Sequence, residues 1–452
     1  MTLRLIFVRH GLSSFNKEGR IQGRNDLSTL TREGQLQAEA AGKTISSIPI
    51  DAIYSSPLQR ASETTKIIIK QHQSELQATY TDELLEVDLG PWSGLTKNEI
   101  KNQFPEELSI WQKEPKELTI NRDDGSKFQP IKELLSQAEN FLKSLFDAHS
   151  GSNKTILIVA HNAILRCLIL KLINEPSKGF RRLKLDNTSI SICNINFNDW
   201  KDRQVQIQCL NNVAHLNPTI PKKRSKKRII LVRHGETDWN KQGRFQGQID
   251  IPLNKNGKSQ AKAASEFLKT NILQKAFSSS LSRPKETAQI ILNEHPGIEI
   301  SLKDNLIEIG HGKWEGKLES EIKTDWPDLL QTWKISPEKV QMPEGENIKE
   351  VSTRSITGWN EICQDLKNDE TALVVAHDAV NKTILCHLLG LMPSNIWMIK
   401  QGNGGVTVID LSDNEGQPDQ ITCLNITSHL GGIIDSTAAG ACLLYTSPSP
   451  RD

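Results

Sequence analysis

The chain carries one ordered set of short motifs twice. The paired segments are Ile-Phe-Val-Arg-His-Gly at 6–11 with Ile-Leu-Val-Arg-His-Gly at 230–235, Arg-Ile-Gln-Gly at 20–23 with Arg-Phe-Gln-Gly at 244–247, and Val-Ala-His at 159–161 with Val-Ala-His at 375–377. The offset between the copies is 224 residues at the first motif and 216 residues at the last, so the spacing is nearly constant. A repeat that runs through most of a 452-residue chain predicts two copies of one domain, each of ordinary length.

The repeat predicts one domain at 1–217, a linker at 218–227, a second domain at 228–432 and a tail at 433–452. The linker contains two prolines and a run of lysine and arginine. We interpret it as a solvated spacer rather than a nucleic-acid-binding patch, because it lies between two complete domains. The residues from Gly440 on match neither domain and resemble translated adapter sequence, so we expect them to be non-native.

Composition argues against several classes of protein. The 55 lysines and arginines balance 54 aspartates and glutamates, so no overall charge points to nucleic acid or to a membrane surface. No apolar stretch is long enough to span a bilayer, and the start of the chain shows no secretory signal. The seven cysteines lack CxxC spacing, which predicts reduced thiols and a cytoplasmic location.

Short apolar runs alternate with amphipathic helical patterns in both copies. Strands are expected at 3–8, 52–55, 155–160, 228–232, 276–279 and 371–376, and helices at 31–46, 60–71 and 131–146. This alternation predicts an α/β fold with a mostly parallel central sheet in each domain. Arg9, Arg60 and His161 each follow the carboxyl end of an expected strand, and that edge is where open α/β sheets bind ligands.

In the first copy, the motif residues have the chemistry that phosphoryl transfer needs. Neutral imidazole is a good nucleophile near pH 7, and His10 lies next to the permanent cation Arg9. Arg9 and Arg60 offer forked donors that suit a tetrahedral oxyanion. His161 and Asn16 can donate further hydrogen bonds to the same oxygens, where negative charge develops in the transition state.

Glu86 is the candidate general acid, which would protonate the leaving oxygen and then deprotonate the attacking water. The second copy repeats the whole set, with His234 as nucleophile, Glu308 as acid, and Arg233, Asn240, Arg283 and His377 around the phosphate. Each of these residues alone would more often be a core, capping or surface residue. Their recurrence together, in order and twice, favours a catalytic site.

Metal binding is the competing interpretation of the same side chains. His10, His161, Glu86 and Asp88 could ligate zinc, but two arginines in the same site would repel a cation. We therefore expect neither a metal nor another cofactor. No GxxxxGK[ST] phosphate loop is present, so an ATP-dependent kinase activity has no visible site.

Arg-His-Gly-Glu-Thr-Asp-Trp-Asn at 233–240 is very similar to the signature of the histidine phosphatase superfamily, the phosphoglycerate mutase-like family. The resemblance covers nearly the whole chain as two tandem domains. It implies three-layer α/β/α domains, a phosphohistidine intermediate and no metal. Gln22, Gly23, Gln246 and Gly247 also match the family pattern and are expected to border the substrate.

The copies depart from the family pattern in different places. The first has Leu-Ser-Ser-Phe at 12–15 where the family usually has Glu-Thr-x-Trp, which removes an acidic residue expected near the pocket mouth. The second has Pro-Glu-Gly-Glu-Asn at 343–347, close to a family segment that the first copy lacks. The tandem layout, with the segment 20–31, resembles the 2-carboxy-D-arabinitol-1-phosphatases and their cyanobacterial relatives.

The resemblance implies a phosphomonoesterase that acts on small phosphorylated sugars or sugar acids. The stretches from acid to second histidine, 75 and 69 residues, are short for the lid of a true phosphoglycerate mutase. They favour a phosphatase over a 2,3-bisphosphoglycerate-dependent mutase, which stays the alternative enzyme. A third interpretation makes one copy, the first being the better candidate, a regulatory or binding domain. The oligomeric state is left open.

Overall fold

The computed structural model describes residues 2–72, 75–122, 124–151, 153–414 and 416–437. The predicted non-native end lies outside these described residues. The chain forms two compact units, residues 1–221 and 222–452, and each is described by itself. The two copies of the sequence repeat therefore correspond to two separate structural units.

The strands of the first unit are β1 (Thr2–Arg9), β2 (Ala52–Ser55), β3 (Ala78–Tyr80), β4 (Ile120–Asn121), β5 (Lys127–Phe128), β6 (Lys154–Ala160), β7 (Ile190–Asn196) and β8 (Gln204–Asn212). Its helices are α1 (Ser14–Glu18), α2 (Arg32–Ile45), α3 (Gln59–His72), α4 (Lys97–Gln103), α5 (Pro105–Lys113), α6 (Pro130–Ala148), α7 (Asn162–Leu172) and α8 (Gly179–Arg182).

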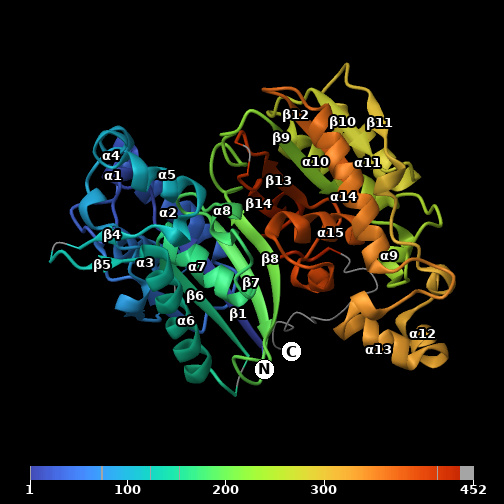
Figure 1. Ribbon diagram of the computed structural model, residues 1–452. Coiled ribbons are helices and arrows are strands. Elements are labelled where there is room, and N and C mark those ends of the chain that lie inside the picture. The colour runs from blue at the N-terminus through green and yellow to red at the C-terminus, as the bar shows by residue number, and fades with distance from the viewer. Residues whose placement is uncertain (1, 73–74, 123, 152, 415, 438–452) are drawn as a thin grey trace. The chain divides into compact units, whose positions relative to one another are not determined.

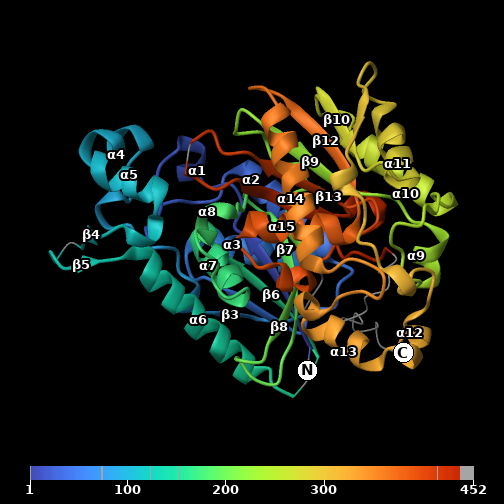
Figure 2. The ribbon, with the colours of Figure 1, turned by 45° about the vertical axis from the view of Figure 1, so that its right-hand side comes forward.

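The central sheet of this unit has the order β3-β2-β6-β1-β7-β8. Its first four strands are parallel, whereas β7 and β8 are antiparallel. Helices cover both faces of the sheet, with α2 packed on α3 and α6 packed on α7 (Figures 1 and 2). Burial on both faces explains why β1 and β6 are continuous apolar runs rather than alternating ones.

The strands of the second unit are β9 (Arg228–Arg233), β10 (Lys275–Ser278), β11 (Ile300–Leu302), β12 (Thr371–Ala376), β13 (Val406–Asp410) and β14 (Gln420–Ile426). Its helices are α9 (Asp238–Gln242), α10 (Lys255–Leu268), α11 (Ser282–Leu292), α12 (Glu319–Asp325), α13 (Pro327–Ile335), α14 (Ile348–Asp365) and α15 (Asp378–Leu389). The order β11-β10-β12-β9-β13-β14 repeats that of the first unit, again with four parallel strands followed by two antiparallel ones.

The predicted α/β fold with a mostly parallel sheet is confirmed in both units. The expected strands and helices are present within two residues of their predicted bounds. The sequence reading did not specify the antiparallel pair that closes each sheet. It also left unassigned the helix pairs α4–α5 and α12–α13, which lie between the acid and the second histidine.

Close backbone contact fixes the loop after the first strand of each unit. A Cβ atom on Gly11 would lie 2.4 Å from the carbonyl oxygen of Gly34, and one on Gly235 would lie 2.3 Å from that of Gly257. The start of α2 or α10 therefore packs directly on the loop that carries the motif histidine. Glycine follows that histidine because no side chain fits between the two backbones.

Lys223 of the predicted linker contacts the second unit, because its Nζ donates to the carbonyl oxygens of Asp369 and Glu370, both at 2.9 Å. Directly after the predicted linker, Arg228 at the start of β9 forms a buried ion pair with Asp410 at 2.6 Å. Of the residues that the structure describes, no helix combines the length and apolar character needed to cross a membrane.

Candidate active site

The motif histidine of each unit is held in one tautomer. His10 and His234 are buried directly after β1 and β9, and the ring Nδ1 of each lies 2.8 or 2.7 Å from the carbonyl oxygen of the following glycine. Because a carbonyl can only accept, Nδ1 must carry the proton. The lone pair of the neutral ring is then on Nε2, which is the nucleophilic nitrogen of such a ring.

Electrostatics keeps both rings neutral. Burial, followed by the nearby cations Arg9 and Arg60, holds the pKa of His10 well below its ordinary value. Burial together with Arg283 and Arg233 does the same for the pKa of His234. In the second unit Arg283 Nε lies 3.3 Å from His234 Nε2, and this arginine must be the donor.

Arg60 and Arg283 are buried, and backbone carbonyl groups position their side chains. Arg60 Nη2 donates to the carbonyl oxygen of Gly23 at 2.9 Å, and Arg283 Nη2 donates to that of Gly247 at 2.7 Å. The carbonyl group of one glycine therefore positions the guanidinium group in each unit. Gln246 lines the pocket of the second unit.

Asn16 and Asn240 are anchored by an asparagine that sequence reasoning missed. Asn187 Nδ2 donates to Asn16 Oδ1 at 3.1 Å, and Asn403 Nδ2 donates to Asn240 Oδ1 at 3.3 Å. These hydrogen bonds occupy Oδ1 of Asn16 and Asn240, so the Nδ2 group of each side chain points away from Asn187 or Asn403. The signal was present in the sequence, because Asn187 and Asn403 have the same spacing from the second histidine in both copies.

The second histidine faces the first across adjacent strand ends. The ring centroids of His10 and His161 are 5.2 Å apart, and those of His234 and His377 are 5.1 Å apart. Register causes this proximity, because the residue before each histidine pairs with its counterpart on the neighbouring parallel strand. The Nε2 atom of the second histidine contacts a serine hydroxyl, at 2.7 Å from Ser56 in the first unit.

Several buried nitrogen atoms of these motifs have no hydrogen-bond partner. They are Arg60 Nε and His161 Nδ1 in the first unit, and Arg233 Nε, Gln246 Nε2 and His377 Nδ1 in the second. Buried polar atoms are rarely left unpaired, so this set indicates a missing ligand that accepts several hydrogen bonds. A tetrahedral oxyanion such as phosphate is such a ligand.

The candidate acid of each unit lies at the start of the helix after the second histidine. Glu86 accepts from the backbone nitrogens of Ala163 and Ile164 at 3.1 and 3.2 Å, at the start of α7. Glu308 accepts from the backbone nitrogen of Ala379 at 3.4 Å, at the start of α15. The structure thus brings all the predicted catalytic side chains to one edge of each sheet.

The two acids differ in their neighbour. Asp378 begins α15 in the second unit, and Asn162 occupies the same position in the first. Burial, followed by the negative charge of Asp378, raises the pKa of Glu308. The Glu308 carboxyl group therefore keeps its proton to a higher pH than an ordinary glutamate does, which suits a general acid.

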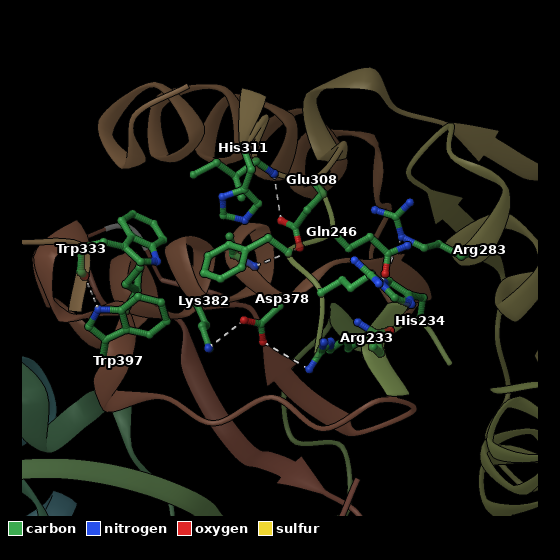
Figure 3. Close-up of a pocket in the computed structure, with 16 residues that line it drawn as sticks. Arg233, His234, Gln246, Arg283, Glu308, His311, Trp333, Asp378, Lys382 and Trp397 are labelled. Carbon is green, nitrogen blue, oxygen red and sulfur yellow. Dashed lines mark hydrogen bonds and ion pairs between the residues drawn. The ribbon is translucent and has the colours of Figure 1, made fainter. Parts of the chain in front are cut away.

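The second unit has a pocket next to these side chains (Figure 3). One wall is aromatic, with the rings of Trp333 and Trp397 5.3 Å apart and edge to face. On another side Asp378 forms ion pairs with Lys382 at 2.8 Å and with Arg233 at 3.4 Å. Among the described residues, no group of three His, Cys, Asp or Glu side chains is arranged to hold a metal ion.

The acidic residue at 236 does not lie where the sequence suggested. Glu236 is buried outside the pocket lining, and its carboxylate accepts from Asn254 Nδ2 at 2.9 Å. Its replacement by Leu12 in the first copy therefore removes a structural contact. The expectation of an acidic residue at the pocket mouth was wrong, because the side chain turns toward the loop before α10.

The segment at 343–347 supports the acid-bearing loop of the second unit. Glu346 pairs with Arg354 at 2.7 Å, and Arg354 Nη2 donates to the carbonyl oxygen of Glu308 at 3.0 Å. In the first unit Arg24 Nε donates to the carbonyl oxygen of Glu86 at 3.1 Å. An arginine thus holds this loop in both units, from α14 in one and from the loop after α1 in the other.

An α/β domain with a neutral histidine, buried arginines and a carboxyl group at one sheet edge is suited to binding phosphate esters. The sequence model of the histidine phosphatase superfamily (branch 1) matches residues 5–211 and 229–423, and the chain belongs to this superfamily. The first match lies within the first structural unit and the second match within the second.

Similar proteins include named phosphatases. A 2-carboxy-D-arabinitol-1-phosphatase of Triticum aestivum is 28% identical over 95% of this chain and 86% of its own length. Phosphoserine phosphatase 1 of Hydrogenobacter thermophilus is 35% identical over 45% of this chain and 94% of its own length. The solved structure of YhfR from Bacillus stearothermophilus is 28% identical, with a TM-score of 0.43, and covers 45% of this chain and 99% of its own. The chain is an enzyme of the histidine phosphatase kind.

Proposed function

We propose that each unit is a metal-independent phosphomonoesterase that works through a phosphohistidine and acts on small phosphorylated sugars or sugar acids. One observation carries the proposal. In both units a histidine with Nδ1 bound to a carbonyl presents Nε2 beside a buried arginine, at the edge where unpaired donors gather. The named phosphatases among the relatives, one for 2-carboxy-D-arabinitol 1-phosphate, support the substrate class. The free cysteines of the described chain fit a cytoplasmic enzyme.

The first half-reaction transfers the phosphoryl group to the protein. Nε2 of His234 attacks phosphorus, the bond from phosphorus to the ester oxygen breaks, and Glu308 gives its proton to the departing oxygen. Arg233, Arg283 and His377 donate to the remaining phosphate oxygens and stabilise the charge that develops there. The product is an alcohol, and the phosphoryl group stays on the histidine.

The second half-reaction restores the enzyme. Glu308, now a carboxylate, removes a proton from water, and the water oxygen attacks phosphorus while the bond to Nε2 breaks. Inorganic phosphate leaves, Glu308 is again protonated and His234 is again neutral. In the first unit His10 and Glu86 have the same two roles, with Arg9, Arg60 and His161 around the phosphate.

We expect hydrolysis and no isomerisation when the chain is incubated with 3-phosphoglycerate. A phosphatase yields glycerate and inorganic phosphate, because water takes the phosphoryl group from the histidine. Phosphorus NMR of the reaction mixture, with and without added 2,3-bisphosphoglycerate, distinguishes the outcomes. Accumulation of 2-phosphoglycerate ahead of inorganic phosphate would favour the mutase instead.

The neighbour of the acid predicts a shift in pH dependence. In a chain whose first site is disabled by His10→Ala, Asp378→Asn removes the negative charge that raises the pKa of Glu308. That pKa should fall, so the protonated acid is lost at lower pH and the basic limb of the kcat/KM profile moves to lower pH.

The first unit offers the reverse substitution as a control. Asn162→Asp, in a chain whose second site is disabled by His234→Ala, should move the basic limb to higher pH. The position of the limb is the readout, since Asp378→Asn also removes an ion pair with Arg233 and can lower the rate. Two limbs that stay in place would contradict the assignment of Glu308 and Glu86 as acids.

A further inference from the structure

The two units differ in charge at three equivalent positions that follow the second histidine, and we call the residues at these positions the wall of each site. Counting from the second histidine, the copies keep one spacing through the next helix, which makes three positions equivalent. They are Asp378 with Asn162, Lys382 with Arg166, and Trp397 with Arg181. All three residues of the second unit line its pocket.

In the pocket wall of the second unit, a carboxylate lies next to the lysine. Figure 3 shows Lys382 and Arg233 both directed at Asp378, at 2.8 and 3.4 Å. Trp397 adds an apolar ring, held by a hydrogen bond from its Nε1 to the carbonyl oxygen of Trp333 at 3.0 Å. Lys382 therefore already has a carboxylate partner before any substrate binds.

The wall of the first unit has an uncompensated cation. Arg166 is only 8% exposed, its guanidinium stacks over the ring of Phe180 at 3.7 Å, and its Nε has no hydrogen-bond partner. Within the described residues no carboxylate lies within ion-pair distance of it. The equivalent of the neutralising Asp378 is Asn162, which carries no charge.

A second arginine reinforces this wall. Arg181 lies over the ring of Trp111 at 5.7 Å, and Trp111 has the place that Trp333 has in the other pocket. Burial, followed by the charge of Arg181, lowers the pKa of Arg166 to about 9, so two cations are held close together. Burying like charges costs free energy that a bound anion would offset.

We propose that the site of the first unit takes a phosphomonoester whose leaving group carries a second anionic group, a carboxylate or another phosphate, which Arg166 and Arg181 bind. The second unit takes a leaving group without a second negative charge. This rests on the proposed phosphatase function of both units. A planar guanidinium pairs with either anion through two parallel hydrogen bonds, so the shared chemistry is that of a compact oxyanion.

The test compares substrates that differ in one anionic group. A full-length chain with His234→Ala retains only the first site, and one with His10→Ala retains only the second. For each chain, kcat/KM is measured for 3-phosphoglycerate against glycerol 3-phosphate and for fructose 1,6-bisphosphate against fructose 6-phosphate. We expect the first site to favour the doubly anionic member of at least one pair by about tenfold or more, and the second site to favour neither or the reverse. The first pair tests a carboxylate and the second a phosphate.

Substitution at the wall links the preference to its residues. In the His234→Ala chain, Arg166→Gln should lower the ratio about tenfold, and Arg166→Lys should lower it less because the charge stays. Asn162→Asp should also lower it, by supplying the neutralising carboxylate of the other unit. Lys143→Gln, which removes an exposed cation of α6, is the control and should leave the ratio unchanged.

The outcomes separate the inference from the function on which it rests. A His234→Ala chain that hydrolyses none of the four esters would overturn the proposed function of the first unit. A chain that hydrolyses them with ratios near one, unchanged by Arg166→Gln, would overturn the inference and leave the function standing. Circular dichroism of each variant shows whether the protein is still folded when its substrate preference changes.

Discussion

Replacing both motif histidines, His10→Ala and His234→Ala together, is expected to lower phosphomonoesterase activity by at least about 10⁴-fold. In the proposed mechanism, alanine removes the ring nitrogen that forms the bond to phosphorus. The loss is measured as release of inorganic phosphate from p-nitrophenyl phosphate, a small ester that serves as a common substrate for both sites. A double variant that keeps more than about one hundredth of the activity would contradict the mechanism.

The single variants show how the activity is divided. If both units are catalytic, His10→Ala and His234→Ala each retain part of the hydrolysis and each still form an acid-labile phosphoprotein at the remaining histidine. If the first unit is regulatory, His234→Ala loses both activity and labelling. His72→Ala, at a histidine whose ring contacts the carbonyl of Ile48 outside the site, is the control for loss of an imidazole.

Much of the site could be predicted because it depends on backbone features that sequence reveals. Parallel strands end at one edge, so residues that directly follow strands come together whatever the intervening sequence. His10 and His161 are of this kind, and register alone brings their rings to 5.2 Å. The glycine after the first histidine is a similar signal, because only glycine leaves room for the close backbone contact with Gly34.

Side-chain directions could not be predicted from the same pattern. Glu236 was expected at the pocket mouth, yet its carboxylate turns away to Asn254. The loop that carries the acid is held by Arg24 and Gln137 in the first unit and by Gln248 and Arg354 in the second, so that two positions keep the contact while the residue types are exchanged. Such contacts depend on how separate helices pack, and a single sequence does not show which long side chains reach across.

The same limit explains why the sequence did not reveal the difference in charge between the two sites. The exchanges of Asp378 for Asn162 and of Trp397 for Arg181 are visible in the sequence, but they look like surface variation. Only the structure shows that Asp378 pairs with two cations beside the acid. The two units thus share the residues of the proposed chemistry and differ in the charge of the residues beside them.

Replacing the acids tests the other half of the mechanism. Glu308→Gln in the His10→Ala chain, and Glu86→Gln in the His234→Ala chain, should lower kcat for an alkyl phosphate such as glycerol 3-phosphate by about 10²–10⁴-fold. Glutamine keeps an oxygen that can accept the backbone hydrogen bonds of Glu86 and Glu308, so the loop should stay in place. It cannot give a proton to an alkoxide or take one from water.

The leaving group distinguishes proton donation from a structural role. p-Nitrophenolate leaves without a proton, so phosphorylation of the histidine by p-nitrophenyl phosphate should be far less affected than with glycerol 3-phosphate. Hydrolysis of the phosphohistidine still needs a base, so a burst of p-nitrophenol and a long-lived phosphoprotein are expected. Asp82→Asn and Asp304→Asn, exposed carboxylates a few residues before each acid, are matched controls and should show neither effect. An equal loss for both esters, without a burst, would show that Glu86 and Glu308 position the site and do not transfer protons.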